Sequence, residues 1–216
     1  VTNDRDAKFP DVKTAFLPKM CQHCEGNNPK NPDPPCVSVC PAVATDVGDD
    51  GVVSQIWSRC IGCRYCQTAC PFEARAFNWW KPDYEGTFKN GLNPEVSVAS
   101  RGTIVKCTFC SHIWKRERDK AVANGILDIN AVTYQTACTK ACPTGAIVFG
   151  DLNDPESEVS KLAKSDRAVR LVNTIDDEPE DKKKALMKKK QFANPKVYYL
   201  TSQKWLRDMM RFKKNS

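Results

Sequence analysis

Hydrophobic and polar residues alternate in short runs along this chain, and no apolar run is long. Strand-sized runs rich in apolar or β-branched residues are predicted at 51–57, 74–77, 103–106 and 146–149. A charged segment with helical character covers residues 113–123 and should end near Asn124-Gly125, because glycine commonly follows the last turn of a helix. Between residues 78 and 102, proline, glycine and asparagine interrupt any periodic pattern, which predicts a long loop.

A second helix is expected close to the C-terminal end, over residues 203–212. Apolar side chains recur there at helical spacing: Trp205, Leu206, Met209, Met210 and Phe212. The apolar side of this amphipathic helix would pack on its own domain or on a partner subunit, and contact with a membrane surface is a third interpretation. No run approaches the roughly 20 apolar residues that cross a bilayer, so no transmembrane helix is predicted.

Composition fits a soluble, loop-rich protein, since 41% of the 216 residues are hydrophobic, 27% are charged and 14 residues are proline. Much of the net charge of +7 comes from late lysine runs at 182–184 and 188–190. We interpret these runs as a solvated surface, although basic segments can also bind anionic lipid or nucleic acid.

Cysteine changes this picture most, because twelve cysteines fall into three groups of four. The groups are Cys21, Cys24, Cys36 and Cys40; Cys60, Cys63, Cys66 and Cys70; and Cys107, Cys110, Cys138 and Cys142. The middle group has the spacing Cys-x2-Cys-x2-Cys-x3-Cys-Pro of bacterial ferredoxins, which bind [4Fe–4S] clusters through such cysteines. The other two groups stretch only the second gap, to eleven and twenty-seven residues, and also end in Cys-x3-Cys-Pro. The spacing therefore predicts three [4Fe–4S] clusters.

The repeat extends beyond the cysteines, because alanine lies four residues after the last cysteine of each group, at Ala44, Ala74 and Ala146. Each unit reads as a strand, a cluster loop with a helical turn and a second strand. Small residues beside the ligands let backbone N–H groups approach the cluster sulfurs. The proline after the last cysteine fixes φ and removes a donor, which ends the loop.

Ligands are expected to cross between groups. One Cys-x2-Cys-x2-Cys loop wraps three corners of a cubane, and in two-cluster ferredoxins the cysteine before proline binds the other cluster. We expect one cluster to be bound by Cys40, Cys60, Cys63 and Cys66 and its neighbour by Cys21, Cys24, Cys36 and Cys70. A third cluster would be bound by Cys107, Cys110 and Cys138, and closed by Cys142 or by a ligand from outside this chain.

Other uses of cysteine fit this spacing less well. Structural zinc favours two pairs of ligands, and the tight triplet Cys60, Cys63 and Cys66 argues against it. Disulfides would not require three copies of one metal-loop spacing. Covalent haem requires Cys-x-x-Cys-His, which is absent. No catalytic constellation or nucleotide-binding motif is present, so we expect no catalytic site.

Four residues next to the ligands are candidates to tune a cluster by hydrogen bonding to its sulfurs: His23, Arg64, Tyr65 and His112. Each lies within two residues of a cysteine. A surface or local packing role is the alternative for each of them.

These observations predict an α+β, loop-rich fold in three parts. Residues 1–102 would form a ferredoxin-like two-cluster module with its linking loop, and residues 103–150 a third cluster-binding unit. Residues 151–216 would form an extended basic C-terminal arm that contains the amphipathic helix.

Three segments carry a resemblance to a known family: Cys60-Ile-Gly-Cys63-Arg-Tyr-Cys66, Lys106-Cys107-Thr108-Phe109-Cys110 and Phe149-Gly150-Asp151-Leu152-Asn153-Asp154-Pro155. The chain resembles, over nearly its whole length, the iron–sulfur subunits of membrane-associated respiratory complexes of the molybdoenzyme type. It is most similar to those of alternative complex III and of the menaquinone reductase complex of sulfate reducers. Such subunits usually carry four cysteine groups and the first is missing here, so either this lineage lost a cluster or the sequence lacks an N-terminal segment.

The resemblance implies a subunit with no catalytic site of its own that relays single electrons. It would connect a multihaem cytochrome c or a catalytic-like subunit with a membrane quinone site. Its hetero-oligomeric partners would include a molybdopterin-enzyme-like large subunit and a quinone-interacting membrane subunit. It would lie as a peripheral subunit on the periplasmic face of the bacterial inner membrane, after export by a twin-arginine signal that this sequence does not contain.

Two other functions stay open. The chain could be the small iron–sulfur subunit of a molybdopterin oxidoreductase of polysulfide, nitrite or formate type, or of a sulfite-reduction membrane complex. A function of another class is a metal-stabilised module that binds nucleic acid through its basic tail. Aromatic residues are not interleaved with the basic runs, which disfavours nucleic acid as a partner.

Overall fold

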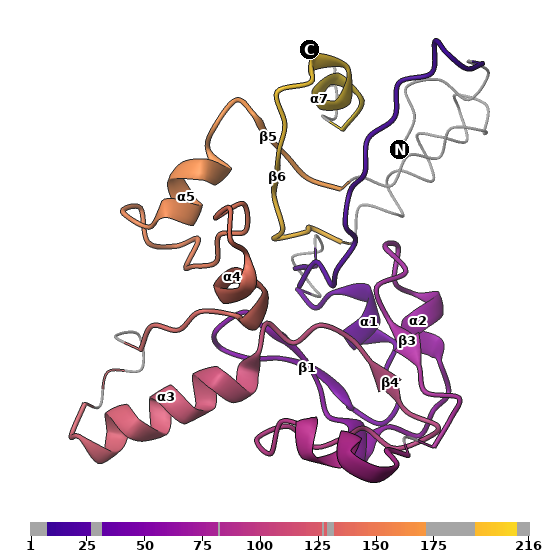
Figure 1. The fold of residues 1–216 in the computed structure, drawn as a ribbon, viewed down its shortest axis with the longest axis vertical. Coiled ribbons are helices and arrows are strands. Elements are labelled where there is room, and N and C mark those ends of the chain that lie inside the picture. The colour runs from indigo at the N-terminus through magenta and orange to yellow at the C-terminus, as the bar shows by residue number, and fades with distance from the viewer. Residues whose placement is uncertain are drawn as a thin grey trace.

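Short helices and strands joined by long loops make up the described chain (Figure 1). The computed structural model describes residues 8–26, 32–81, 83–126, 128, 132–171 and 193–210. The lysine runs at 182–184 and 188–190, and the last residues of the predicted C-terminal helix, lie outside this part. None of the described helices is long and apolar enough to cross a membrane.

The elements in chain order are α1 (Pro35–Ser38), β1 (Thr45–Val47), β2 (Val53–Gln55), η1 (Trp57–Arg59), α2 (Tyr65–Thr68), β3 (Ala76–Phe77), η2 (Gly86–Gly91), β4 (Ile104–Val105), α3 (Ser111–Ala123), α4 (Ala137–Ala141), α5 (Glu158–Ala163), β5 (Ala168–Val169), β6 (Tyr199–Leu200) and α7 (Lys204–Met210). The strands form three antiparallel two-stranded sheets, β1-β2, β3-β4 and β5-β6. Such small sheets are at best marginally stable alone, so this fold depends on packing between its loops and short elements.

The first two cysteine groups build one compact part, with α1, α2 and the sheets β1-β2 and β3-β4 gathered together (Figure 1). In each group a one-turn helix precedes the last cysteine and a strand follows it, so α1 leads to β1 and α2 leads to β3. Helices α1 and α2 contact each other. Four apolar side chains at most 6% exposed fill the space between these elements: Ala44, Val53, Phe72 and Ile104.

Three of the four predicted strands are confirmed, as β2, β3 and β4, although each is shorter than its apolar run. The strand predicted at 146–149 is wrong. Backbone N–H groups of Ala146 and Ile147 approach the sulfur of Cys142. The ring of Phe149 packs on the rings of Phe109 and Tyr134, with centroids 5.3 and 4.9 Å apart. No described segment pairs with these residues as a strand.

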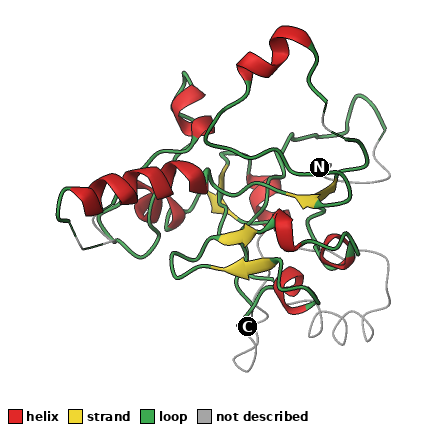
Figure 2. Ribbon diagram, turned by 90° about the horizontal axis from the view of Figure 1, so that it is seen from below, coloured by secondary structure: helices red, strands yellow, loops and turns green. Residues whose placement is uncertain are grey.

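The predicted helix at 113–123 is confirmed as α3, which begins two residues earlier and ends before Asn124. Gly125 follows with a φ of 80°, the left-handed conformation that terminates helices. Helix α3 projects from the rest of the molecule in both views (Figures 1 and 2) and buries none of its residues.

The C-terminal helix is also present, as α7, and it packs on its own chain. Leu206 and Met210 of α7 are buried against Val169 of β5. Residues of the N-terminal segment, Ala15 and Leu17, pack against the same cluster. Both ends of the described chain therefore meet in one small apolar cluster, on the side of the molecule that carries β5, β6 and α7 (Figure 1).

Candidate iron–sulfur cluster sites

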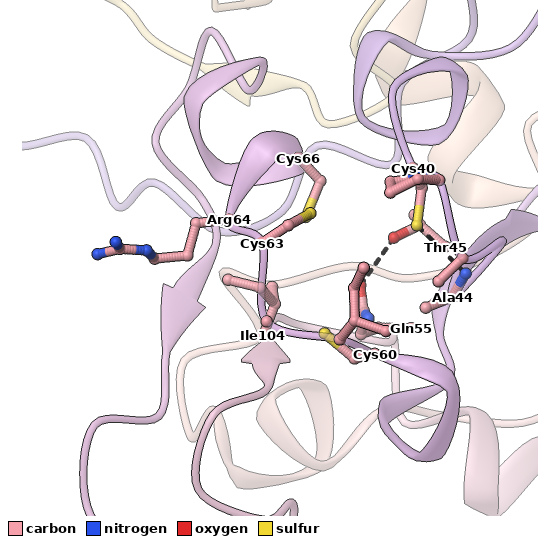
Figure 3. Close-up of a pocket in the computed structure, with 13 residues that line it drawn as sticks. Cys40, Ala44, Thr45, Gln55, Cys60, Cys63, Arg64, Cys66 and Ile104 are labelled. Atoms are coloured by element: carbon pink, nitrogen blue, oxygen red, sulfur yellow. Dashed lines mark hydrogen bonds between the residues drawn. The ribbon is translucent and has the colours of Figure 1, made fainter.

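One pocket is lined by four cysteines from two different groups. Cys60 and Cys63 belong to the loop between η1 and α2, Cys66 lies in α2, and Cys40 follows α1. Figure 3 shows these four side chains on different sides of the same space. They do not meet at one point: within the described residues, no three His, Cys, Asp or Glu side chains are grouped to hold a single metal ion.

A second set of cysteines lies close together near α1 and α2. Burial and, after it, the neighbouring thiolates of Cys21, Cys36 and Cys70 raise the pKa of Cys24 to about 12. The same neighbours, Cys21 and Cys70, add to the burial that raises the pKa of Cys36. The last cysteine of the middle group thus lies with the first group, while Cys40 lies with the middle group.

The third group is more open. The sulfur of Cys110 accepts a hydrogen bond from the Ala137 amide (3.4 Å), and the Cys138 sulfur contacts the Thr136 hydroxyl at 3.1 Å. Burial raises the pKa of Cys107, and the charge of Cys110 adds to this effect. The beginning of α4 therefore brings Cys138 toward the Cys107–Cys110 loop.

Cys142, by contrast, makes its contacts within its own loop. Its sulfur lies 3.4 Å from the hydroxyl of Thr144. That hydroxyl and the backbone N–H groups of Ala146 and Ile147 lower the pKa of the Cys142 thiol to about 7.

Backbone donors converge on the last cysteine of the first group in a similar way. The Ala44 amide donates to the Cys40 sulfur at 3.2 Å. Burial opposes ionisation of this thiol, but the N–H groups of Ala44, Thr45 and Ala42 outweigh it and lower its pKa. Donors aimed at a thiolate sulfur are what a cluster ligand requires, because they stabilise its negative charge.

Three cation-bearing or polar side chains lie among these sites, and two of them, His23 and Arg75, are buried. His23 is 1% exposed, its Nδ1 accepts the Val53 amide at 3.0 Å, and its ring stacks on Phe109 with centroids 3.7 Å apart. Arg75 is 4% exposed. Lys106 contacts the carbonyl oxygens of Val53 and Cys107.

The candidate tuning residues differ in placement. His23 belongs to the Cys21–Cys24 loop, and its ring stacks on Phe109 of the Cys107–Cys110 loop. The hydrogen bond from the Val53 amide holds the ring in this position between the two loops. The guanidinium of Arg64 points away from the pocket (Figure 3) and lies over the Trp79 ring at 4.9 Å. Tyr65 is 58% exposed, and His112 lies in the first turn of α3.

Arg75 and Lys106 were not expected from the sequence. Arg75 sits directly before β3, inside an apolar run, and a charged residue in a run that should be buried is the signal that could have identified it.

Comparison with known proteins agrees with this geometry. Two 4Fe-4S dicluster domain families match the chain, over residues 12–85 and 59–146. The menaquinone reductase iron–sulfur cluster-binding subunit of Nitratidesulfovibrio vulgaris is 43% identical over 203 residues, which are 92% of this chain and 70% of that protein.

Two further relatives have related names. The Hdr-like menaquinol oxidoreductase iron–sulfur subunit 1 of Archaeoglobus fulgidus is 39% identical over 79% of this chain and 58% of its own length. The arsenate respiratory reductase iron–sulfur subunit of a Shewanella species is 31% identical over 77% of this chain and 73% of its own length. The relatives are subunits of multi-subunit oxidoreductases, and the cysteines that line the pockets here lie within the matched domains. The chain belongs to the family of iron–sulfur cluster-binding, electron-transfer subunits built from [4Fe–4S] dicluster domains.

Proposed function

We propose that this chain relays single electrons through three [4Fe–4S] clusters arranged in sequence. Each cluster, when bound, supplies a one-electron carrier. Site A would be formed by Cys40, Cys60, Cys63 and Cys66, and site B by Cys21, Cys24, Cys36 and Cys70. Site C would be formed by Cys107, Cys110 and Cys138, with Cys142 or a ligand from outside this chain as its fourth ligand.

The exchange of cysteines between the first two groups carries this proposal. Cys40 lines the pocket of the middle group, and Cys70 lies with the first group. Two-cluster ferredoxins exchange their ligands in this way. Arrangements that only close a loop, such as a disulfide or a structural metal, would not require a reciprocal exchange.

Site B supports a middle position in the relay. It adjoins site C, because burial raises the pKa of Cys107 against the opposing effect of the Phe109 amide, and the charge of Cys21 adds to the rise. It also adjoins site A, because α1 and α2 contact each other and carry ligands of both sites. Cys63 of site A and both Cys107 and Cys138 of site C are exposed, whereas Cys21 is buried. Electrons could therefore enter at one outer site and leave at the other.

The proposed partners follow from the relatives and from the surface beside site A. Ile61 and Tyr65, which flank the exposed Cys63, are 69% and 58% exposed, and they suit a docking surface for another subunit. A relative named menaquinone reductase supports a quinone-interacting membrane subunit as one partner. A molybdopterin-enzyme-like large subunit and a multihaem cytochrome c complete the proposal, with the complex at the periplasmic face of the inner membrane.

A small-subunit role in a molybdopterin reductase is the second candidate, and the arsenate reductase relative favours it. Purification of the native complex separates the two. A large catalytic subunit that reduces a soluble oxyanion would support the second candidate, and a multihaem cytochrome would support the first.

Iron and acid-labile sulfide per chain, followed by an EPR redox titration of anaerobically purified protein, test the proposal. Three sites predict about 12 iron atoms, since each cubane contains four. About 8 iron atoms would mean that site C needs a ligand from another segment or subunit. Zinc in place of iron, with no EPR signal on reduction, would contradict electron transfer.

A further inference from the structure

Arg75 is a buried cation held in a fixed position. Its side chain is 4% exposed, and its Nη1 donates to the Gln55 Oε1 at 2.7 Å and to the Thr45 hydroxyl at 3.2 Å. The Thr45 hydroxyl and Gln55 Oε1 are themselves 2.8 Å apart. Since Thr45 and Gln55 are paired residues of β1 and β2, this sheet fixes the guanidinium against its surface.

In the part of the chain that the structure describes, the positive charge of Arg75 is not neutralised by a carboxylate, the usual partner of a buried arginine. Within the described residues no carboxylate forms an ion pair with it, and its Nη2 is buried without a hydrogen-bond partner. A buried, unpaired guanidinium is strongly destabilising, because the charge has lost its water and gained no partner. The placement therefore requires a negative group that faces Arg75.

The nearest candidates are sulfurs from both cluster sites. Burial raises the pKa of Cys36 in site B, and the charge of Arg75 is the largest effect that opposes it. The same is true of Cys66 in site A. In return, although burial works against the charged form, Cys36 and Cys66 raise the pKa of Arg75. The two hydrogen-bond partners of Arg75, Thr45 and Gln55, line the same pocket as Cys66. Arg75 thus lies within electrostatic reach of one ligand of each site.

We propose that Arg75 is a counter-charge shared by the clusters of sites A and B, and that it raises the reduction potential of both. Reduction adds one electron to a cluster and makes it more negative, so a fixed cation between the two sites favours the reduced state of each. The shared cation also weakens the repulsion between the two sites when both are reduced. The inference rests on the proposed assignment of clusters to sites A and B.

The test is an EPR-monitored redox titration of three variants beside the wild-type chain. Arg75→Gln removes the charge and keeps a hydrogen-bond donor for Gln55 or Thr45. Arg75→Lys keeps the charge. Arg64→Gln is the matched control, because Arg64 is an arginine between two ligands of site A whose guanidinium points away from the pocket (Figure 3).

Arg75→Gln should lower the potentials of two clusters together and leave the third nearly unchanged. Arg75→Lys and Arg64→Gln should titrate close to wild type. Iron content is measured in every sample. If Arg75→Gln loses iron while Arg75→Lys keeps iron and wild-type potentials, the charge is required and the proposal stands.

Three results would overturn it: unchanged potentials in an iron-replete Arg75→Gln, equal shifts in Arg75→Gln and Arg64→Gln, or loss of both clusters in Arg75→Lys despite its retained charge. Failure of the proposed function is a separate outcome. It would be visible in the wild-type chain, as missing iron or missing iron–sulfur signals, before any variant is compared.

Discussion

Left-handed residues occupy the same two positions in all three ligand loops. The residue before the second cysteine has a positive φ in each group, at His23 (44°), Gly62 (73°) and Phe109 (50°). So does the third residue after the last cysteine, at Val43 (47°), Glu73 (52°) and Gly145 (64°). This conformation is unfavourable for residues other than glycine, and it turns neighbouring amides in one direction. The Ala44 amide that donates to the Cys40 sulfur directly follows such a residue.

Gly62 is the position where this conformation leaves the least room. A Cβ there would lie 2.3 Å from the carbonyl oxygen of Gly102, whereas at Gly86, which also has a positive φ, it would meet nothing within 4 Å. Gly62→Ala should therefore lower stability by more than Gly86→Ala, which bears only the left-handed strain of about 1 kcal/mol. Thermal unfolding and iron retention measure the difference. Equal losses in both variants would show that the Gly102 contact relaxes.

If ligands cross between the first two groups, the last cysteine of each group binds the cluster of the other group. Cys70→Ser should abolish the same EPR signal as Cys24→Ser, although Cys70 belongs to the loop of the middle group. Cys40→Ser should abolish the signal that Cys63→Ser removes. Each variant should lose about four iron atoms. If Cys70→Ser instead removes the signal lost in Cys63→Ser, each group binds its own cluster.

Spacing predicts the cysteine sets, because a cubane restricts which positions can bind it, and these sets stay a prediction. Spacing could not predict Arg75 or Lys106. Their placement follows from where β1-β2 and β4 lie, and a single charged residue in a short apolar run does not reveal that placement. The buried His23 was among the expected tuning residues, but only the fold shows its stacking on Phe109.

At the scale of elements, pairing decides which apolar runs become strands. Residues 103–106 form β4 because β3 lies alongside, with Phe77 opposite Ile104. Residues 146–149 have a similar composition but no described partner strand. The backbone N–H groups of Ala146 and Ile147 point to the Cys142 sulfur. Composition alone cannot distinguish these two cases, since a strand is defined by its neighbour. The helix α5 was also not predicted, although Ser157 caps it by accepting the Ser160 amide at 3.2 Å.

Helix α7 offers a stability test at this scale. Leu206 is 3% exposed in the apolar cluster with Val169 and Met210. Leu206→Ala should lower the free energy of unfolding by about 2–5 kcal/mol, because it removes buried methyl groups and leaves a cavity. Thermal unfolding of the cluster-loaded protein measures this change. Leu200→Ala on β6, where the side chain is 43% exposed, is the control and should change stability little. A small effect at Leu206 would mean that α7 packs elsewhere in solution.

At the scale of the whole molecule, two cations lie along the proposed relay, the buried Arg75 and the half-buried Lys106. Arg75 lies between Cys36 and Cys66 of sites B and A. Burial lowers the pKa of Lys106, and the charges of Cys21, Cys36 and Cys107 oppose this effect. Lys106 therefore faces sites B and C.

Lys106→Met should lower the reduction potentials of sites B and C and leave site A unchanged, because the lost charge lies near only those two. Redox titration monitored by EPR separates the three signals. Lys19→Met is a suitable control, since Lys19 is half-exposed and lies 3.8 Å from Glu73. A shift confined to site A would contradict this placement of Lys106.

The two ends of the described chain also close over site B. The Glu25 and Asn194 backbones form a bridge, the Lys196 amide donates to the Gln22 carbonyl at 3.0 Å, and the Tyr199 hydroxyl donates to the Pro18 carbonyl at 2.7 Å. The ammonium group of Lys196 donates to the Gly51 carbonyl at 2.6 Å. The loop that contains Cys21 and Cys24 is thus covered by a segment from the far end of the sequence.

This cover sets an order of events during synthesis. The covering segment is translated about 170 residues after the Cys21–Cys24 loop, which at roughly 5–20 residues per second leaves that loop without its cover for about 10–30 s. We expect site B to be accessible to iron and sulfide from this side until residues 193–200 have been made, and folding of those residues to close this route. Ribosome-stalled chains that end before Ala193 should exchange iron at site B faster than released chains do.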